Sequence, residues 1–333
     1  MKTNKLQSIK SLLRYYNPRT IKKTKKLKFV GVENREVYNI TAPFRVKRKV
    51  YLIGRVELRE HEQGTRVIFF RRLKHSHHWH VDENCPVFDL QDPFIFKFRD
   101  LNIFGGVEVI QRASKISLSY RTVFYKGKDI HNLKKFSHGP WGMKGIRFIS
   151  LPNTENKEFS VPSIPKSKEV SGNKIGVFTR PQGKRGRRGK IGFEIIDSLQ
   201  KLNSRTLSRA GIIKGVFTRG EWGGINEVHF LKNNKLGVLG HIARFSKDKK
   251  RYYYPITFMF DYETKKFSGL KIIAARSDLP HGEAKRDDLY NVIYPGGIIR
   301  NEKDIAKLYV GVGDAESYEI TIEDPFSEYE YEG

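Results

Sequence analysis

The stretch NKLGVLGHIAR, residues 234–244, decides the fold class of this 333-residue chain. It places aliphatic residues around two glycines and then ends on polar and charged residues, which is typical of a short strand between turns. Four other stretches repeat the pattern: YLIGRVE (51–57), NIFGGVEV (102–109), NKIGVFTR (173–180) and LYVGVGDAE (308–316). The copies are about 50 to 75 residues apart, close to the length of one four-stranded blade with its loops. We therefore predict an all-β fold, a five-bladed β-propeller.

Glycine inside a strand indicates a close approach of another backbone or side chain. The innermost strand around a propeller channel is crowded in this way, so we expect the repeated stretches to be innermost. Their charged residues would then converge on one axial pocket. The alternative is a β-sandwich, in which the glycines serve hairpin turns and the charges face solvent.

Three segments are predicted from composition. Residues 1–30 form a short basic N-terminal arm, and residues 31–333 form a single catalytic domain. Within that domain, residues 152–173 are rich in Ser, Pro, Lys and Asn and are expected to form a loop insertion.

The formal net charge of +27 raises the question of a nucleic-acid partner. Lysines are scattered over turns and strand edges, and no nucleic-acid reading module is visible, so we interpret the charge as a solvated surface and expect no nucleic-acid partner. Cys85 is the only cysteine, which excludes an intramolecular disulfide and favours a reducing compartment. With no apolar run of membrane-spanning length and no signal-peptide core, we expect a cytoplasmic protein without a membrane partner.

Asp92 lies in LQDPF (90–94), before a proline and at the start of the strand-like run FIFKF. Pro93 keeps Asp92 out of helical geometry, so the carboxylate can point from the mouth of a strand into a pocket. An Asp-Pro pair is also a common turn, and that reading remains open.

Basic residues cluster in GMKGIRF (142–148), RPQGKRGRRGK (180–190) and AKRDDLYNV (284–292). Arg and Lys can hold phosphate through charge-assisted hydrogen bonds. The arginine-rich loop 184–190 is expected to face solvent, and its glycines lack the spacing of a Walker motif.

Two further segments contain polar clusters. The stretch GEWGGINEVH (220–229) contains Glu221, Trp222, Asn226, Glu227 and His229. Carboxylates and amides can bind sugar hydroxyls and an indole can stack on a pyranose ring, so the stretch could bind a sugar. The alternative is a corner of a blade with a buried tryptophan. HSHHWH (75–80) invites a metal interpretation, but alternation sends its histidines to two faces and no carboxylate or cysteine accompanies them at known spacing, so we expect no metal there and no cofactor.

The ordered motifs VYNITAPF, YLIGRVE, LQDPF, FGGVEV, GPWGMKGIRF, FTRPQG, GEWGGINEVH, GVLGHIA, AKRDDLYNV, YPGGII and YVGVGDAE, across residues 30 to 326, resemble the family of dual mannosyltransferase/mannoside phosphorylases. That family is distantly similar to the five-bladed β-mannoside phosphorylases. The resemblance implies inverting transfer of mannose, from a β-1,2-mannoside to inorganic phosphate or from GDP-mannose to an oligosaccharide. It leaves open whether the protein forms a homo-oligomer.

The resemblance also implies roles for individual residues. Asp92 corresponds to the general acid/base, and Asp314 to a carboxylate that holds mannose hydroxyls. The phosphate-binding candidates are Lys144, Arg147, Arg180, His241, Lys285 and Arg286. The remaining sugar-binding candidates are Asn39, Arg55, Glu108, Asn226 and Glu227.

This assignment agrees with the chemistry of the two reaction types. An inverting hydrolase needs a second carboxylate to activate water, whereas a phosphorylase needs one acid and a cationic site for its anionic nucleophile. Two alternatives remain: a glycoside hydrolase that uses Asp92 with Asp314 or Glu227 as base, and a non-catalytic propeller that binds glycans.

Overall fold

The computed structural model describes residues 6–60, 64–110, 118–152 and 174–331. In this part of the chain most of the regular structure is β-strand, as predicted. Except for residue 152, the predicted insertion at 152–173 lies outside the described residues.

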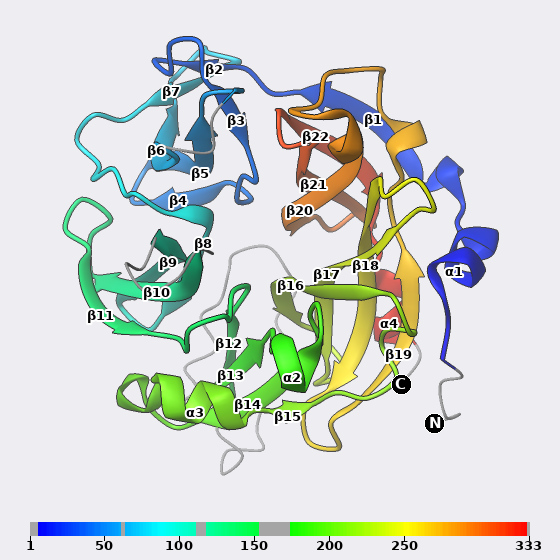
Figure 1. The fold of residues 1–333 in the computed structure, drawn as a ribbon. Helices are drawn as coiled ribbons and strands as arrows, with labels where there is room; N and C mark the ends of the chain where they lie inside the picture. The colour runs from blue at the N-terminus through cyan, green and yellow to red at the C-terminus, as the bar shows by residue number, and fades with distance from the viewer. Residues whose placement is uncertain (1–5, 61–63, 111–117, 153–173, 332–333) are drawn as a thin grey trace.

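The strands form four sheets around a common centre (Figure 1). The first has the order β2-β7-β6-β5-β3, with β4 paired to β5. Its strands are β2 (Phe29–Val30), β3 (Glu36–Tyr38), β4 (Phe44–Val46), β5 (Lys49–Glu57), β6 (Arg66–Arg72) and β7 (Trp79–Val81). The second sheet runs β11-β10-β9-β8 and consists of β8 (Gln91–Phe98), β9 (Leu101–Ile110), β10 (Ser119–Gly127) and β11 (Lys134–His138).

The third sheet runs β12-β13-β14-β15 and the fourth contains eight strands. The third consists of β12 (Arg147–Leu151), β13 (Lys174–Thr179), β14 (Gly192–Ile196) and β15 (Gly211–Ile212). The fourth consists of β16 (Trp222–Phe230), β17 (Leu236–Phe245), β18 (Arg251–Asp261), β19 (Lys266–Ile272), β20 (Asn291–Arg300), β21 (Ile305–Val312), β22 (Glu316–Glu323) and β1 (Ile21–Lys26). Its two antiparallel halves are joined only by a short parallel pairing, Tyr252 to Asn291 and Tyr253 to Val292.

Short helices lie at the periphery (Figure 1). They are α1 (Ile9–Tyr15), α2 (Gly183–Gly186), α3 (Ser204–Arg209) and α4 (Ser327–Tyr331), with the 3₁₀ turns η1 (Pro18–Thr20), η2 (Leu199–Lys201), η3 (Arg276–Asp278) and η4 (Asp287–Leu289). No helix in the described ranges has the length and apolarity to cross a membrane.

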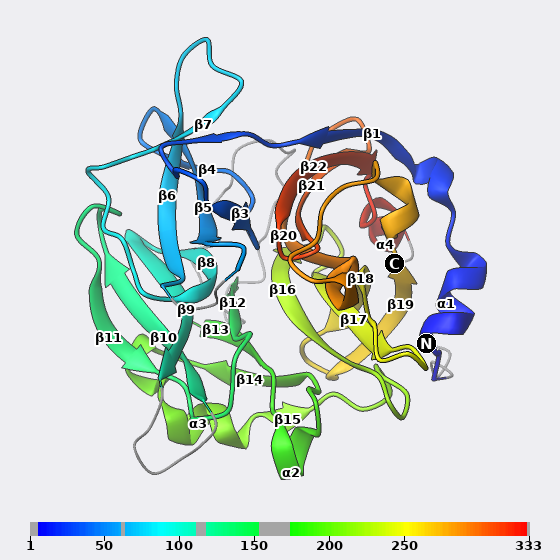
Figure 2. The same ribbon diagram turned by 45° about the horizontal axis from the view of Figure 1, so that its top comes forward.

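The N-terminal segment closes the ring of sheets. Strand β1 pairs antiparallel with β22, so the two ends of the chain meet in one sheet, as Figure 2 shows. Before it, α1 buries Ile9 and Leu12 against the core around β17 and β19. The segment that is basic by composition thus contributes both a strand and a buried apolar face.

The hydrophobic core lies between neighbouring sheets. Tyr51 and Phe69 of the first sheet share a buried cluster with Phe104 and Val123 of the second. Because both faces of a middle strand are covered, β5 and β9 are buried almost continuously instead of alternating. Burial of such side chains contributes about 1.5–3 kcal/mol each.

The five repeated stretches correspond to β5, β9, β13, β17 and β21, but the prediction that they are innermost is wrong. Strands β3, β8, β12, β16 and β20 lie nearest the centre, and each repeated strand is second in its sheet (Figure 1). The glycines make room for side chains of the innermost strands. A Cβ on Gly105 would lie 2.5 Å from the ring of Phe94 in β8, and one on Gly54 would lie 2.8 Å from Val37 in β3.

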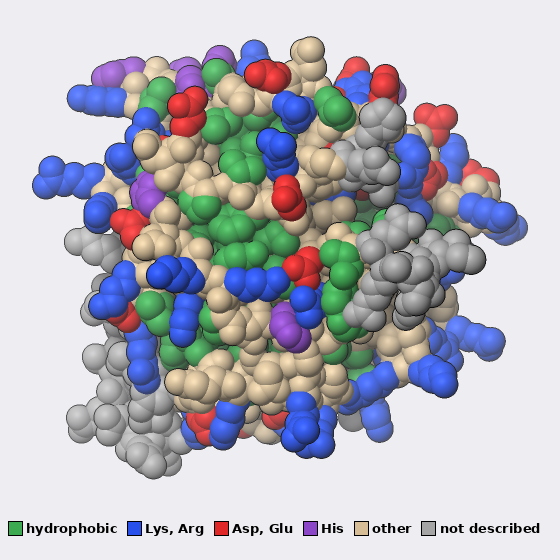
Figure 3. All heavy atoms as spheres, turned by 60° about the vertical axis from the view of Figure 1, so that its left-hand side comes forward, with side chains coloured by type: hydrophobic (Ala, Val, Ile, Leu, Met, Phe, Trp, Pro, Cys, Tyr) green, Lys and Arg blue, Asp and Glu red, His purple; other side chains and the backbone are tan. Residues whose placement is uncertain are grey.

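On the face that carries the first two sheets, basic side chains are spread out instead of forming one patch. Figure 3 shows Lys and Arg scattered over the face that carries the first two sheets, with Asp and Glu among them. This distribution agrees with a solvated surface.

Candidate active site

Asp92 lies at a β-bulge in the innermost strand β8. The register between β8 and β9 shifts between Gln91 and Phe94, so Asp92 and Pro93 are not paired in the ladder. Proline is tolerated at a bulge because no ladder hydrogen bond is needed from it. The bulge directs the carboxylate away from the sheet, where 12% of the side chain is exposed. Asn39 Nδ2 donates to Asp92 Oδ1 at 2.9 Å, and Arg55 Nη1 lies 3.6 Å from the same oxygen.

Three residues of this centre have left-handed backbone geometry. The φ angles are 46° at Asn39, 48° at Asp92 and 53° at Asp314. Such conformations are uncommon outside glycine, although Asn and Asp tolerate them best. Each residue lies at a bulge or just beyond a strand end, next to the centre of the ring. Strained backbone of this kind clusters at functional sites, and here it turns three polar side chains toward one region.

Two arginines form the cationic side of the centre. Arg147 begins β12, and its Nε donates to the carbonyl of Asn226 at 2.8 Å. Arg180 follows β13, and its Nε donates to the carbonyl of Gly223 at 2.6 Å. Both residues are only 6% exposed. A Cβ on Gly189 would lie 2.7 Å from Arg180 Nε, so this glycine leaves space for the guanidinium.

A second bulge positions an amide and an imidazole. Strand β16 shifts register between Ile225 and Glu227, which leaves Asn226 unpaired in the ladder. Its Oδ1 lies 2.8 Å from Nδ1 of His241, on the adjacent strand β17. The imidazole stacks on Tyr253, with ring centroids 5.6 Å apart, and lies 5.1 Å from the ring of Tyr294.

A buried hydrogen-bond network around the carboxylate of Glu57 holds Arg55 in place. Glu57 accepts from Arg55 Nη2 at 2.9 Å and also bonds Lys285, Tyr38 and Thr65. The ammonium of Lys285 is therefore neutralised by Glu57 instead of standing free for a phosphate.

The charges of these groups act on one another. Burial raises the pKa of Asp92, but the charges of Lys144, Arg55 and Arg147 and the hydrogen bond from Asn39 outweigh it, so the net pKa is below its ordinary value. The carboxyl is thus ionised at neutral pH. Burial, with Arg55 opposing, raises the pKa of Asp314.

Burial has the opposite effect on the cationic groups and lowers their pKa values. Burial is the largest cause that lowers the pKa of Lys144, helped by Arg180 and Arg55 and opposed by Asp92. Burial and the charges of Arg180, Lys144 and Arg147 lower the pKa of His241 well below its ordinary value, so the imidazole is neutral. An arriving anion would relieve this mutual repulsion.

Most of the candidate residues gather at this centre, and three lie elsewhere. Those that gather are Asn39, Arg55, Asp92, Lys144, Arg147, Arg180, Asn226, His241, Lys285 and Asp314. Glu108 pairs with Arg121 and Lys135, and the half-exposed Arg286 donates to Asp288. Glu227 accepts from the backbone N–H of Ile298 at 2.6 Å and from His229.

Sequence reasoning missed Tyr294, which lies on the innermost strand β20 beside His241. Asp92 and burial raise its pKa, with burial the larger cause, to about 12. The only signal was its position before the Pro-Gly-Gly of the strand 291–300, where a bulge between Pro295 and Gly297 follows.

The arrangement suits an anion beside a proton-transferring carboxylate. Among the described residues, neither Arg147 nor Arg180 makes an ion pair, because their hydrogen bonds go to neutral carbonyls. Buried charges without a counterion are costly, so these groups are prepared for an anionic partner. Asn39 Oδ1 is also buried without a hydrogen-bond partner in the described part of the chain, whereas Asn226 hydrogen-bonds both His241 and Tyr294. Asn39 Oδ1 could accept from a hydroxyl group.

A family model described as "Protein of unknown function (DUF1861)" matches residues 14–172 and 165–328. No curated protein matches the chain. Among solved structures, the chain is 29% identical to MPT-4, a mannose phosphorylase from Leishmania mexicana in complex with phosphate ion, covering 96% of this chain and 93% of that chain with a TM-score of 0.81. It is 28% identical to MPT-1, a GDP-Man-dependent mannosyltransferase from Leishmania mexicana, covering 96% and 95% with a TM-score of 0.81.

A more distant structure is the beta-1,2-mannobiose phosphorylase from Listeria innocua in complex with beta-1,2-mannobiose. It is 14% identical, with 90% of this chain and 94% of that chain covered and a TM-score of 0.59. At that identity the similarity extends to the fold alone.

Proposed function

The chain belongs to the DUF1861 family, and from that premise we propose that it is an enzyme that transfers mannosyl groups. The transfer runs from a β-1,2-mannoside to inorganic phosphate, from GDP-mannose to an oligosaccharide, or in both ways. The similarity to a mannose phosphorylase and to a GDP-Man-dependent mannosyltransferase supports this proposal.

We propose that the fold is a five-bladed propeller. The eight-stranded sheet divides at the short β18–β20 pairing into two antiparallel sets, β16-β17-β18-β19 and β20-β21-β22-β1. With the other three sheets this makes five sets. The innermost strands β8, β12, β16 and β20 contact one another in turn. The first sheet completes the circle, because β5 contacts β8 and β3 contacts β21 and β22. We assign residues 31–333 to this catalytic domain and residues 1–30 to a basic arm that joins the last set.

One observation carries the functional proposal: within the described part of the chain, Asp92 faces the buried Arg147 and Arg180, neither of which makes an ion pair with a carboxylate. Burial holds Arg147 and Arg180 at 6% exposure while carbonyl oxygens satisfy only part of their donors. An inverting hydrolase would need a second carboxylate in that place to activate water. An anionic nucleophile such as phosphate needs cations instead.

In phosphorolysis, Asp92 gives its proton to the glycosidic oxygen as the bond from that oxygen to C1 of mannose breaks. A phosphate oxygen attacks C1 from the opposite face, and mannose 1-phosphate forms with inversion. Lys144, Arg147 and Arg180 hold the phosphate and stabilise its charge. In synthesis from GDP-mannose, Asp92 accepts the proton of the acceptor hydroxyl, and the same cations receive the diphosphate of GDP.

The low pKa of Asp92 fits this pair of reactions. In the free enzyme the carboxylate is ionised, as a general base in synthesis must be. When a phosphate neutralises the neighbouring cations, burial and the phosphate charge both favour the protonated form. The acid needed for phosphorolysis therefore forms when the nucleophile binds.

Asp314, Arg55 and Asn39 form the sugar-binding side of this proposal. Asn39 holds Asp92 through its Nδ2 and keeps a buried, unpartnered Oδ1 that can accept from a sugar hydroxyl. We further propose a cytoplasmic protein that uses no cofactor, and we leave its oligomeric state as a question for solution measurements.

The test is a substrate screen with and without the two phosphate-containing reactants. Incubation of the protein with β-1,2-mannobiose and phosphate should release mannose 1-phosphate, or incubation with GDP-mannose should extend a mannoside. Mannose release that is indifferent to phosphate would instead identify a hydrolase. Binding of mannosides without turnover under either condition would identify a glycan-binding propeller.

A further inference from the structure

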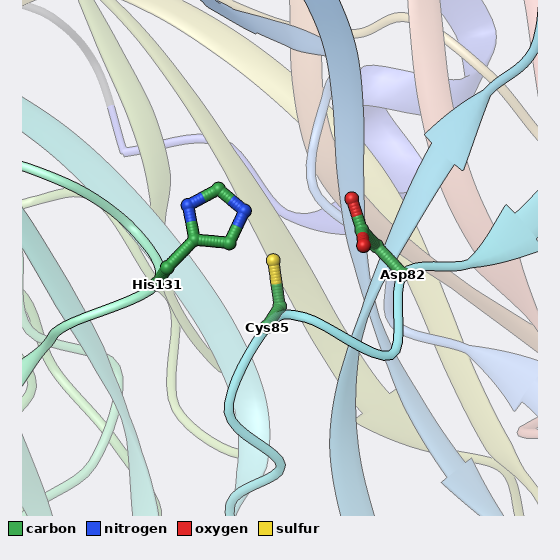
Figure 4. A group of neighbouring side chains, drawn as sticks. All are labelled: Asp82, Cys85 and His131. Carbon is green, nitrogen blue, oxygen red and sulfur yellow. The ribbon is translucent and has the colours of Figure 1, made fainter.

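A second cluster of chemically active side chains lies between the first two sheets, apart from Asp92. Asp82 follows β7, Cys85 lies three residues later, and His131 lies in the connection between β10 and β11. One ligand atom from each lies within 4.8 Å of the others. Figure 4 shows the carboxylate, the sulfur and the imidazole directed into one shared space.

Asp82 and Tyr51 are buried side by side at this cluster. The Asp82 side chain is only 2% exposed and Tyr51 only 1%, and the two side chains hydrogen-bond to each other. The nearest cation to Asp82 Oδ2 is Arg71 Nη1, at 3.8 Å, which is too far for a hydrogen bond. A buried carboxylate is costly unless its charge is balanced, and a bound cation would balance it more closely than Arg71 does.

The imidazole of His131 has the arrangement of a metal ligand. Its Nδ1 bonds the carboxylate of Asp129, and Nε2 is the ring nitrogen turned toward Cys85 in Figure 4. Histidines that bind metals almost always use the other ring nitrogen in such a bond, which fixes the tautomer and raises the basicity of the ligand. Asp129 and His131 also line a cavity of about 350 Å³ that is open to solvent.

Cys85 is buried beside Asp82 and His131, and its sulfur is one of the three atoms that face the shared space. Metals bind cysteine as the thiolate, so this sulfur is placed to act as a ligand.

We propose that Asp82, Cys85 and His131 bind a zinc ion, with water from the adjoining cavity as the fourth ligand. A carboxylate, a thiolate and an imidazole form a donor set that zinc accepts in tetrahedral geometry. Tetrahedral ligands at zinc distances lie about 3.3–3.8 Å apart, so atoms at the present limit of 4.8 Å need to approach one another by about 1 to 1.5 Å. Asp82, Asp129 and the thiolate bring three negative charges to the ion, and the cations nearby are Arg71, Lys49 and Lys47, the last 3.8 Å from Asp129.

The ion joins the segment between β7 and β8 to the connection between β10 and β11. These segments belong to neighbouring sheets, whose buried cluster already includes Tyr51 and Cys85. The first of them continues into β8, which carries Asp92. The site therefore clamps two sheets and steadies the approach to the bulge at Asp92.

The test uses the full chain, freed of metal by a chelator and reloaded with Zn²⁺ or Co²⁺. We expect one bound metal per chain and, with Co²⁺, a thiolate-to-cobalt charge-transfer band. Because Cys85 is the only cysteine, that band reports this site alone. Cys85→Ser should abolish the band, and Asp129→Asn should weaken binding by roughly 10- to 100-fold through loss of the hydrogen bond to His131. Zinc should raise the melting temperature of the wild type and not that of Cys85→Ser.

His131→Ala serves if Cys85→Ser fails to fold, since its side chain is 33% exposed. The matched control is His77→Ala in the exposed stretch HSHHWH, which should leave metal content unchanged. Absence of the charge-transfer band in metal-loaded wild type would overturn the proposal. So would metal that is retained by both Cys85→Ser and His131→Ala but lost from His77→Ala.

Discussion

Replacement of Asp92 by Asn separates the proton-transfer role of this residue from its place in the structure. Asparagine has nearly the same shape, and its amide oxygen can still accept from Asn39 Nδ2, as Asp92 does at 2.9 Å. The variant lacks the transferable proton and the negative charge. Loss of a general acid or base lowers kcat by about 10²- to 10⁴-fold, or about 3–5 kcal/mol in the barrier.

The same variant should bind phosphate more tightly. Two unit charges roughly 8 Å apart interact by about 2 kcal/mol at an effective dielectric constant of about 20. Removal of the carboxylate charge therefore removes repulsion that is equivalent to about a 30-fold change in phosphate affinity. Phosphate should also raise the melting temperature of Asp92→Asn more than that of the wild type, because the cations have lost a counter-charge.

The assay combines steady-state kinetics, with mannoside and phosphate varied separately, and thermal melts with added phosphate. The matched control is Asp89→Asn, the same substitution at an exposed position three residues earlier, which should change neither quantity. Turnover by Asp92→Asn within about threefold of the wild type would refute the acid/base role. Weaker phosphate binding in the variant would refute the placement of the anion beside Asp92.

Other expectations follow from the same geometry. Lys144→Met should raise the KM for phosphate by about 10-fold or more and leave the KM for mannoside nearly unchanged. Equal changes in the two KM values would contradict the role of Lys144 in phosphate binding. Since the pKa of Asp92 lies below its ordinary value, kcat/KM for phosphorolysis should rise as pH falls, whereas transfer from GDP-mannose should decline; pH profiles in both directions check this. Glu57→Ala should cost about 3–5 kcal/mol in urea unfolding because Arg55 and Lys285 lose their buried partner. Burial raises the pKa of Glu57, but Arg55 and the hydrogen bonds to Glu57 outweigh it, so the net pKa is lowered. The stabilisation is therefore present above the pKa of Glu57 in the unfolded chain and is lost as the pH falls through the folded-state pKa. A Glu57→Ala variant that unfolds like the wild type would contradict this.

The sequence predicted the strands well because their glycines mark a real packing constraint. Each glycine-containing repeat corresponds to one strand of the structure, and Gly54 and Gly105 lie against side chains of the neighbouring strand. Close approach by itself does not say which strand approaches. The prediction that the repeats are innermost is therefore wrong, and each of them is second in its sheet.

The site was predicted less completely because bulges decide where its side chains point. Asn226 and Glu227 are adjacent in sequence, yet the bulge in β16 turns Asn226 to His241 while Glu227 bonds the backbone of Ile298. Neither alternation nor composition reveals such a shift. The cluster of Asp82, Cys85 and His131 was also beyond sequence reasoning, since His131 reaches it from the neighbouring sheet.

The central claim is that one carboxylate and a group of cations transfer mannose with inversion. The most direct measurement is phosphorus NMR of the protein incubated with a β-1,2-mannoside and phosphate. The account predicts α-mannose 1-phosphate as the first product from wild-type protein and its loss in Asp92→Asn. Formation of the β-anomer, or free mannose produced at the same rate without phosphate, would contradict it.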